Sequence, residues 1–506
     1  MTVPARITLA GVLTGVATRD ELPREWSELQ VAGLEYDSRK VEKDTLFFAF
    51  QGARVDGRQF AQEAVDQGAC AVVSELSPAG GLEVPWIQVE HGRKALAVAA
   101  RNFYARPDER IRFTGITGTN GKTTTAYLAD AILRSTGALT AMIGTIEYRL
   151  GEETRKAPNT TPESLDVIRL AAELEQRGGR YLTMEVSSHG LALARVYSLE
   201  FHTAVFTNLT RDHLDFHHTM EEYAAAKRLL FIPQDGPAPR WAILNSDDPA
   251  SAAMRPPSAQ TITYGISPDA DLRAENIRSG FDGLHFDVVY QGQRQAFVSP
   301  LVGRINVSNI LAAAGVGLSY AMDLPAIAEG IRMCPPVPGR FERVDAGQPF
   351  LVVVDYAHTD DALRNVIQAS RELAGPARVI TLFGCGGDRD RTKRPLMGMA
   401  AAELSNFVVL TSDNPRSEDP LAIMNDVMVG LGRFDTPHLA EPDRAKAIAY
   451  ALGEAKAGDV VLLAGKGHET YQILQDRTID FDDRETARHI LRSLGYIRQG
   501  PEKHAI

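Results

Sequence analysis

The stretch Gly115-Ile-Thr-Gly-Thr-Asn-Gly-Lys-Thr-Thr-Thr125 constrains this chain more than any other part of its sequence. The apolar-alternating residues 110–114 before it predict a short buried strand, and residues 125–133 after it have helical spacing. A strand, a glycine-rich turn and a helix in this order bind nucleotide phosphates, because backbone N–H groups and the helix N-terminus point at the phosphate oxygens. The common pattern has a glycine where this chain has Ile116.

The residues of this turn have the chemistry that ATP and Mg²⁺ require. Lys122 is expected to reach the outer phosphates, and Thr123 to offer a hydroxyl to Mg²⁺. The full set expected to bind ATP at the turn is Gly118, Thr119, Asn120, Gly121, Lys122, Thr123 and Thr124.

Composition limits the classes of protein to which the chain can belong. Its 506 residues suffice for roughly two to four domains, and its net charge of −11 disfavours nucleic acid as a partner. The three cysteines have no CxxC spacing, which disfavours both a disulfide framework and a cysteine zinc site. No apolar run approaches the ~20 residues of a membrane span. We therefore expect a cytoplasmic protein.

Alternating strand and helix patterns divide the chain into three α/β regions. Residues 1–106 predict a small N-terminal domain that ends at an Arg-Pro-Asp linker. Residues 107–336 hold the phosphate-binding turn, together with buried strands that end in polar residues, which is typical of a parallel sheet. A proline-rich linker at 335–339 precedes a second parallel α/β pattern over residues 337–506.

Three polar residues of the central region are considered as candidate site residues. Glu185 ends a buried strand, which suits a second Mg²⁺ ligand beside Thr123. His213 follows another strand end among acids, where it is suited to bind metal or orient a phosphate. Lys227 lies in an amphipathic helical pattern, and by itself this pattern indicates a solvated surface lysine.

Four polar loops follow predicted strands of the third region. They begin at Asp355, Gly384, Asp413 and Gly465. Because the carboxyl ends of parallel strands meet at one edge of a sheet, we expect these loops to converge on a substrate site. Arginine suits a carboxylate, and acids and amides suit an ammonium, so the expected substrate is an amino acid.

The order of these motifs resembles that of the Mur ligases of cell-wall assembly, over essentially the whole chain. The family's own turn reads GTNGKTT, which accounts for the absent glycine. The matching segments are Asp37–Arg39, Gly118–Thr124, Asn159–Pro162, Glu185–His189, Asp212–Asp215, Ala226-Lys227, Gly339–Glu342, Asp355–His358, Asp388–Asp390, Asp413–Arg416 and Gly465–Glu469. The resemblance is greatest to the ligases that add the third residue of the peptidoglycan stem.

The resemblance implies roles for individual residues. Lys227 matches a lysine that is carbamylated in this family, which replaces the surface interpretation. The implied metal ligands are Thr123, Glu185, His213 and carbamylated Lys227, and the implied catalytic residues are Lys122, Glu185, His213 and Lys227. Asn306, Asn309 and Arg340 would also bind ATP. The UDP-linked substrate would contact Ser38, Ala53, Arg54, Val55, Asn159, Thr160, Thr161, Ser187 and Arg195, and the amino acid would contact Arg389, Asp413, Asn414, Pro415, Arg416, Gly465 and Glu469.

The resemblance also implies an activity and its substrates. The protein would join meso-diaminopimelate to UDP-N-acetylmuramoyl-L-alanyl-D-glutamate through an acyl phosphate formed with ATP. We expect it to be a monomer. The segment Asp413-Asn-Pro-Arg416 resembles that of the diaminopimelate enzymes, and the planar fork of Arg416 suits the distal carboxylate that L-lysine lacks.

Other functions remain open on the sequence. A sibling ligase that adds L-lysine is one alternative. Folylpolyglutamate synthetase and the ligase that adds D-Ala-D-Ala are others, but the segments Asp413–Arg416 and Asn159–Pro162 disfavour both. A P-loop switch or motor is a different class, but the chain lacks a base-reading Asn-Lys-x-Asp loop and the arginine-rich loops would then have no role.

Overall fold

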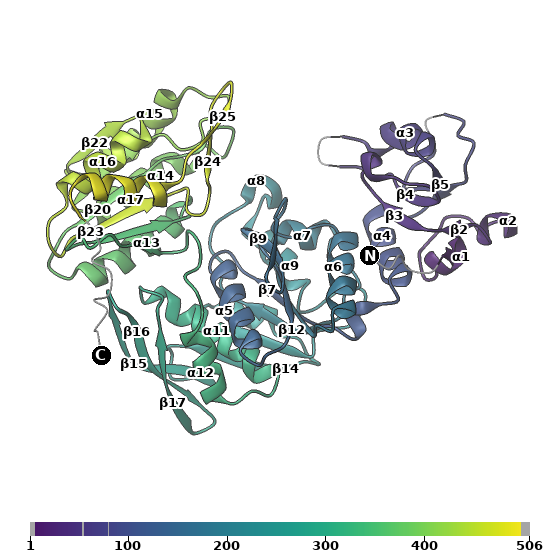
Figure 1. Cartoon of the computed structure of the whole chain (residues 1–506), viewed down its shortest axis with the longest axis horizontal. Coiled ribbons are helices and arrows are strands. Elements are labelled where there is room, and N and C mark those ends of the chain that lie inside the picture. Colours follow the sequence, from purple (N-terminus) through teal and green to yellow (C-terminus); the bar gives the residue numbers. More distant parts are fainter. Residues whose placement is uncertain (1–5, 53–54, 79, 497–506) are drawn as a thin grey trace, which may run out of the picture.

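Three α/β bodies follow one another along the chain in the computed structural model, which describes residues 6–52, 55–78 and 80–496 (Figure 1). The purple N-terminal body lies at one end, the blue-to-teal central body in the middle, and the green-to-yellow C-terminal body at the other end. This arrangement agrees with the α/β class predicted for each region. Among the described residues, no helix is long and apolar enough to cross a lipid bilayer.

The N-terminal body is built on a four-stranded parallel sheet. Its strands, in sheet order, are β3 (Gly33–Glu35), β4 (Thr45–Phe48), β5 (Ala69–Ser74) and β6 (Trp86–Gln88). The other elements are β1 (Ile7–Thr8), β2 (Gln30–Val31), α1 (Leu9–Val12), α2 (Arg24–Ser27), α3 (Ala61–Asp66) and α4 (Gly92–Phe103). Leu96 and Ala100 of α4 belong to the same buried apolar cluster as Leu34 of this sheet and Leu165 of the central body. The first two bodies therefore share a continuous core.

The central body is an eleven-stranded sheet whose middle strands are parallel. These parallel strands, in sheet order, are β8 (Thr140–Ile143), β11 (Tyr181–Glu185), β7 (Arg112–Thr117), β12 (Phe201–Phe206), β13 (Trp241–Asn245) and β14 (Gln260–Gly265). The helices are α5 (Lys122–Arg134), α6 (Ser164–Gln176), α7 (Ser188–Ala192), α8 (Leu214–His217), α9 (Met220–Arg228), α10 (Ser251–Met254), α11 (Ile305–Ser319) and α12 (Leu324–Arg332). β7 lies between β11 and β12, so the turn that follows it is at the centre of the sheet edge.

The prediction of a parallel central sheet did not include the strands at its two margins, which pair with one another in antiparallel fashion. One margin consists of β9 (Glu147–Leu150) and β10 (Glu153–Lys156). The other consists of β15 (Leu272–Gly280), β16 (Gly283–Tyr290) and β17 (Gln293–Ser299). β10 has no buried residue, and only part of each of the other four strands is buried. They therefore lack the continuous apolar runs by which parallel strands are recognised.

The C-terminal body has a six-stranded sheet, parallel except at the strand β18. Its strands, in sheet order, are β18 (Glu342–Val344), β19 (Leu351–Asp355), β23 (Val460–Ala464), β20 (Val379–Phe383), β21 (Phe407–Thr411) and β22 (His438–Glu441). The helices are α13 (Asp360–Ala374), α14 (Lys393–Leu404), α15 (Pro420–Leu431), α16 (Arg444–Glu454) and α17 (Asp483–Ser493), and β24 (Tyr471–Ile473) and β25 (Thr478–Asp480) form a hairpin.

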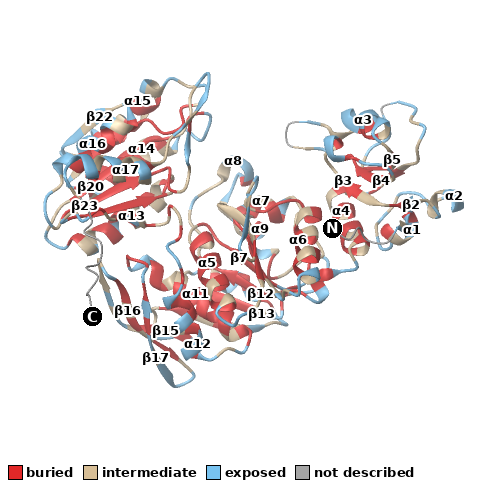
Figure 2. Ribbon diagram, in the orientation of Figure 1, coloured by how far each residue is buried: buried red, intermediate tan, exposed pale blue. Residues whose placement is uncertain are grey.

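Burial follows the strands, as Figure 2 shows. Separate apolar clusters cover the two faces of the C-terminal sheet. With both faces covered, a parallel sheet leaves its carboxyl edge for polar loops. The edges of the central and C-terminal sheets thus supply the side chains of the site described next.

Candidate functional site

The turn after β7 has the conformation that a phosphate-binding loop requires. Gly118 and Gly121 have φ angles of +148° and +86°, and a Cβ on Gly118 would lie 1.8 Å from Thr207 Oγ1. Asn208 fixes the turn from the neighbouring strand end, because the Asn120 N–H donates to its Oδ1 at 2.8 Å and the Thr119 N–H donates to its carbonyl at 2.9 Å. Helix α5 begins at Lys122, so its first N–H groups face the turn.

Two lysine ammonium groups meet at one carbonyl of this turn. Lys122 Nζ donates to Gly118 O at 3.0 Å and to Thr119 O at 2.8 Å, and Lys227 Nζ donates to Gly118 O at 2.7 Å. Lys227 is only 1% exposed, so the surface position indicated by its helical pattern is wrong. Burial lowers the pKa of Lys122, and burial together with the nearby Lys122 charge lowers the pKa of Lys227 well below its usual value. Neither lysine forms an ion pair with a carboxylate among the described residues, so a bound phosphate would be a favourable partner for both.

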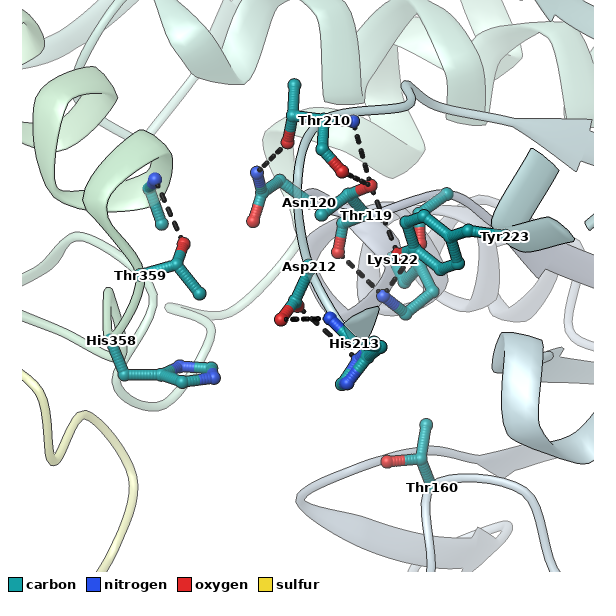
Figure 3. Close-up of polar contacts among 12 residues, drawn as sticks. Thr119, Asn120, Lys122, Thr160, Thr210, Asp212, His213, Tyr223, His358 and Thr359 are labelled. Atoms are coloured by element: carbon teal, nitrogen blue, oxygen red, sulfur yellow. Dashed lines mark hydrogen bonds and ion pairs between the residues drawn. The ribbon is translucent and has the colours of Figure 1, made fainter. Parts of the chain in front are cut away.

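Glu185 and His213 face the same space from the ends of β11 and β12. The Glu185 carboxylate accepts hydrogen bonds from the hydroxyls of Thr123 at 3.0 Å and Thr145 at 3.1 Å. His213 adopts a φ of +54° and packs its ring edge-on against His189, with the ring centroids 4.9 Å apart. Burial lowers the pKa of His213, which keeps the ring in the neutral form that binds metals. Figure 3 shows His213 beside Asp212 and below Lys122.

The metal ligands expected from the sequence are Thr123, Glu185, His213 and carbamylated Lys227, and the first three of them line one cavity. In the described part of the chain, no group of three or more His, Cys, Asp or Glu side chains is arranged to hold a metal ion. Glu185, His213 and the Thr123 hydroxyl would provide three oxygen or nitrogen donors. Carbamylation of Lys227 would add a fourth, carboxylate-like donor, so the donor chemistry fits Mg²⁺ only for the modified lysine.

The cavity over the turn, about 490 Å³ in volume, also contains the residues expected near the adenine and the outer phosphates. Asn306 and Asn309 line it from the start of α11, and Asn309 Nδ2 donates to Asn306 Oδ1 at 2.9 Å. Arg340 reaches in from the C-terminal body, where its Nη2 donates to Thr123 Oγ1 at 3.0 Å. Its Nε is buried without a hydrogen-bond partner among the described residues, which leaves a donor for an anion.

The residues expected to bind the UDP-linked substrate fall into two groups. Thr160 and Ser187 line the cavity, and Thr161 stands behind them, donating its hydroxyl to Glu185 O at 2.9 Å. Arg195 Nη1 donates to Thr161 O at 2.9 Å, and Asn159 is exposed beside this cluster.

The second group lies in the N-terminal body. Ser38 donates its hydroxyl to Glu63 Oε2 at 2.8 Å, and Val55 is 45% exposed. Ala53 and Arg54 lie outside the described residues. Of the expected UDP-substrate residues that the structure describes, Thr160 and Ser187 thus line the cavity, whereas Ser38 and Val55 lie in the N-terminal body.

A second cavity, of about 400 Å³, holds the residues expected to bind an amino acid. Its lining includes Arg389, Asp413, Asn414, Arg416, Gly465 and Glu469. Arg416 Nη1 donates to Gly387 O at 2.6 Å, and Asn414 Nδ2 donates to Glu469 Oε2 at 2.9 Å. Pro415 is buried and packs against Gly387. A Cβ on Gly387 would lie 1.9 Å from the carbonyl oxygen of Pro415. The predicted convergence of loops at this sheet edge is present in the structure.

The three regions of the chain match three parts of one protein family. Residues 30–104 match the model described as Mur ligase family, catalytic domain, residues 116–317 match the Mur ligase middle domain, and residues 339–467 match the Mur ligase, glutamate ligase domain. The chain belongs to the Mur ligase family.

Several Mur ligases resemble the chain over nearly their full length. It is 60% identical over 491 residues to UDP-N-acetylmuramoyl-L-alanyl-D-glutamate--2,6-diaminopimelate ligase of Solibacter usitatus, covering 97% of this chain and 99% of that protein. It is 46% identical to the enzyme of the same name from Geobacillus thermodenitrificans, covering 90% and 94%. A solved structure of a ligase with that name aligns with a TM-score of 0.71 at 32% identity, covering 97% and 100%. This Mur ligase is therefore an enzyme of the ligase class, as the sequence predicted.

Sequence reasoning left Lys466 out of the site of this Mur ligase. Its side chain is fully buried, with Nζ 3.3 Å from both Asp413 Oδ1 and Glu469 Oε2 and 3.2 Å from Asn414 Oδ1. It therefore neutralises two carboxylates that would otherwise repel each other in a buried loop. The sequence pattern that could have identified Lys466 is its position between two glycines, directly after a buried strand.

Proposed function

We propose that this Mur ligase joins meso-diaminopimelate to UDP-N-acetylmuramoyl-L-alanyl-D-glutamate, with cleavage of ATP. The observation that carries the proposal is that the two cavities adjoin, since five residues line both: Asp212, His213, Tyr356, His358 and Thr359. An activated carboxylate formed over the phosphate-binding turn can thus be attacked by an amine held in the C-terminal body. The names of the 60% and 46% identical relatives support the choice of substrates.

Phosphoryl transfer would take place over the turn. The D-glutamate carboxylate attacks the γ-phosphate of ATP, giving an acyl phosphate and ADP. Lys122 and Arg340 would bind the phosphate oxygens, because both present N–H donors beside Thr123. Thr123, Glu185, His213 and carbamylated Lys227 would hold Mg²⁺, which when bound neutralises charge on the phosphates.

The burial of Lys227 supports the proposed carbamylation. A neutral amine adds to CO₂ and loses a proton, which turns a buried base into a carboxylate-like anion. The lowered pKa of Lys227 favours the neutral amine that this addition needs. The product would stand beside Lys122, whose positive charge would then have a negative partner.

Amide formation would take place where the two cavities meet. Arg389 would bind the carboxylate beside the reacting amine, and Arg416 the distal carboxylate. Asn414 and Glu469 would bind the distal ammonium. The acyl phosphate must be kept from water. Closure of the C-terminal body over the turn would do this, and it is supported by the contacts of Arg340 with Thr123 and of Asp361 with Asn120, at 3.0 Å each.

Phosphate release measured with each component omitted in turn would test the proposal. We expect release only when ATP, Mg²⁺, the UDP-linked dipeptide and meso-diaminopimelate are all present, with the UDP-linked tripeptide as product by mass spectrometry. ATP hydrolysis that needs no amino acid acceptor, or equal turnover with a folate substrate, would refute it.

Three further predictions belong to the same proposal. We propose domains at residues 1–106, 107–336 and 337–506, a division supported by the sheets, whose strands fall within these ranges. A monomeric state and a cytoplasmic location stay predictions from the sequence.

A further inference from the structure

The boundary between the two cavities is where the reacting atoms of the proposed ligation must meet. An amino acid enters the second cavity as an ammonium ion, and its nitrogen has no free electron pair until a proton leaves. The five residues that line both cavities lie at this boundary, and they are therefore the first candidates for the group that takes this proton. This argument rests on the proposed function.

Four of the five boundary residues are unsuited to accept the proton. Burial raises the pKa of Tyr356 to about 12, so its phenol keeps its own proton. The Thr359 hydroxyl caps α13 by accepting the Ala362 N–H at 3.2 Å. His213 is assigned above to the metal. Both oxygens of Asp212 are engaged by His213, whose backbone N–H donates to Oδ1 at 2.8 Å and whose Nε2 lies 3.3 Å from Oδ2. His358 remains.

Hydrogen bonding fixes which nitrogen of His358 is free. Its Nδ1 lies 2.9 Å from the carbonyl oxygen of Tyr356. A carbonyl only accepts hydrogen bonds, so Nδ1 carries the proton and Nε2 presents a lone pair. The ring is half-buried, and Figure 3 shows it directed from the C-terminal body towards Asp212 and His213 across the cleft.

The charges around His358 keep its ring neutral. Burial lowers the pKa of His358, the cations Lys393 and Arg340 lower it further, and the Asp212 carboxylate opposes them. The Tyr356 ring lies tilted against the His358 ring, with the centroids 4.7 Å apart and an interplanar angle of 56°. His468 contacts the same Tyr356 ring, and burial lowers the pKa of His468 to about 3. The same cations would lower the pKa of an ammonium ion bound nearby, which eases its loss of a proton.

We propose that His358 Nε2 is the base that deprotonates the incoming amino acid. The ammonium N–H bond breaks, its proton moves to Nε2, and the electron pair stays on nitrogen. That pair forms the C–N bond at the acyl phosphate, and collapse of the tetrahedral adduct breaks the C–O bond to phosphate. The departing phosphate takes the second proton from nitrogen, and His358 returns its proton to solvent.

Hydroxylamine separates this role from a structural one, because it is neutral at neutral pH and attacks acyl phosphates without a base. In His358→Gln we expect amide formation with meso-diaminopimelate to fall by about 10²–10⁴-fold, the usual contribution of a general base. Hydroxamate formation from ATP and the UDP-linked dipeptide should stay close to that of the unmodified enzyme. The remaining ligation should rise with pH as free amine accumulates, whereas the unmodified enzyme stays level across the same range.

Two further variants complete the experiment. His358→Asn retains a donor for the Tyr356 carbonyl and should behave like His358→Gln. His438→Gln is the matched control, since His438 is exposed and makes the same contact, with Nδ1 3.1 Å from Thr436 O, away from both cavities. It should ligate normally.

The possible outcomes distinguish failure of the proposed role of His358 from failure of the proposed ligase function. Normal ligation by both His358 variants, or equal loss of hydroxamate and amide, would overturn the role of His358 while leaving the ligase assignment intact. An unmodified enzyme that forms no hydroxamate from ATP and the UDP-linked dipeptide would overturn the proposed function, and the base with it.

Discussion

Replacing Arg416 with alanine should sharply narrow the preference for meso-diaminopimelate over L-lysine. Both hydrogen bonds recorded for its guanidinium within the described chain come from Nη1, to Gly387 O and Asn414 O. The edge formed by Nε and Nη2 is therefore left for a ligand in the second cavity. This edge is the planar pair of donors that binds a carboxylate with two parallel hydrogen bonds.

The expected size of the effect follows from those two bonds. Each hydrogen bond to a charged group contributes roughly 1.5–3 kcal/mol, and Arg416 is only half-buried, so about 3–4 kcal/mol in total is reasonable. At about 1.4 kcal/mol per factor of ten, kcat/KM for meso-diaminopimelate should fall by about 10²–10³-fold. L-Lysine has no distal carboxylate, so its kcat/KM should change little. A preference near 10⁴-fold, the size expected when a buried polar partner is missing, should shrink by the same factor.

The assay is initial-rate ligation with each amino acid at saturating ATP and UDP-linked dipeptide. Arg389→Ala provides the matched contrast, because Arg389 is proposed to bind the carboxylate that both amino acids share. It should lower kcat/KM for the two substrates equally. Arg416→Lys keeps the charge without the planar fork and should fall between the alanine variant and the unmodified enzyme.

Two results would refute the reasoning. Equal losses of kcat/KM for the two amino acids in Arg416→Ala would show that Arg416 supports the structure of the loop and does not recognise the distal carboxylate. Comparable kcat/KM for the two amino acids in the unmodified enzyme would show that the distal carboxylate is not recognised at all.

Three other variants test the central body. Lys227→Ala should nearly abolish ligation and be rescued by a short carboxylic acid but not by bicarbonate; near-normal turnover without additive would contradict the carbamate. Lys122→Ala should remove phosphoryl transfer yet still bind the UDP-linked dipeptide by calorimetry, and a matching loss of that binding would count against separate sites. His218→Gly should raise the free energy of unfolding by about 1 kcal/mol in denaturant titration, because His218 has φ +61° and ψ −44° at the end of α8, and an unchanged or lower value would show that the strain is absent.

Local pattern was enough to predict the phosphate-binding turn and the C-terminal loops. Gly118 and Gly121 need backbone angles that favour glycine, and strand and helix periodicity on either side is a property of neighbouring residues. Buried strands that end in polar residues likewise placed Asp413, Arg416 and Glu469 at one edge of a parallel sheet. These features depend on short stretches of chain, so they can be predicted from the sequence alone.

Other features depend on contacts between distant segments, and only the tertiary structure decided them. Lys227 has the helical pattern of a surface lysine, yet its ammonium binds Gly118, 109 residues away, and lies buried beside Lys122. The antiparallel margins and the charge-neutralising position of Lys466 had no distinct local pattern. The junction of the two cavities at His358 arises only when two bodies face each other. The sequence by itself determined which chemistry each loop carries, and the packing of distant segments decided which loops act on the same atoms.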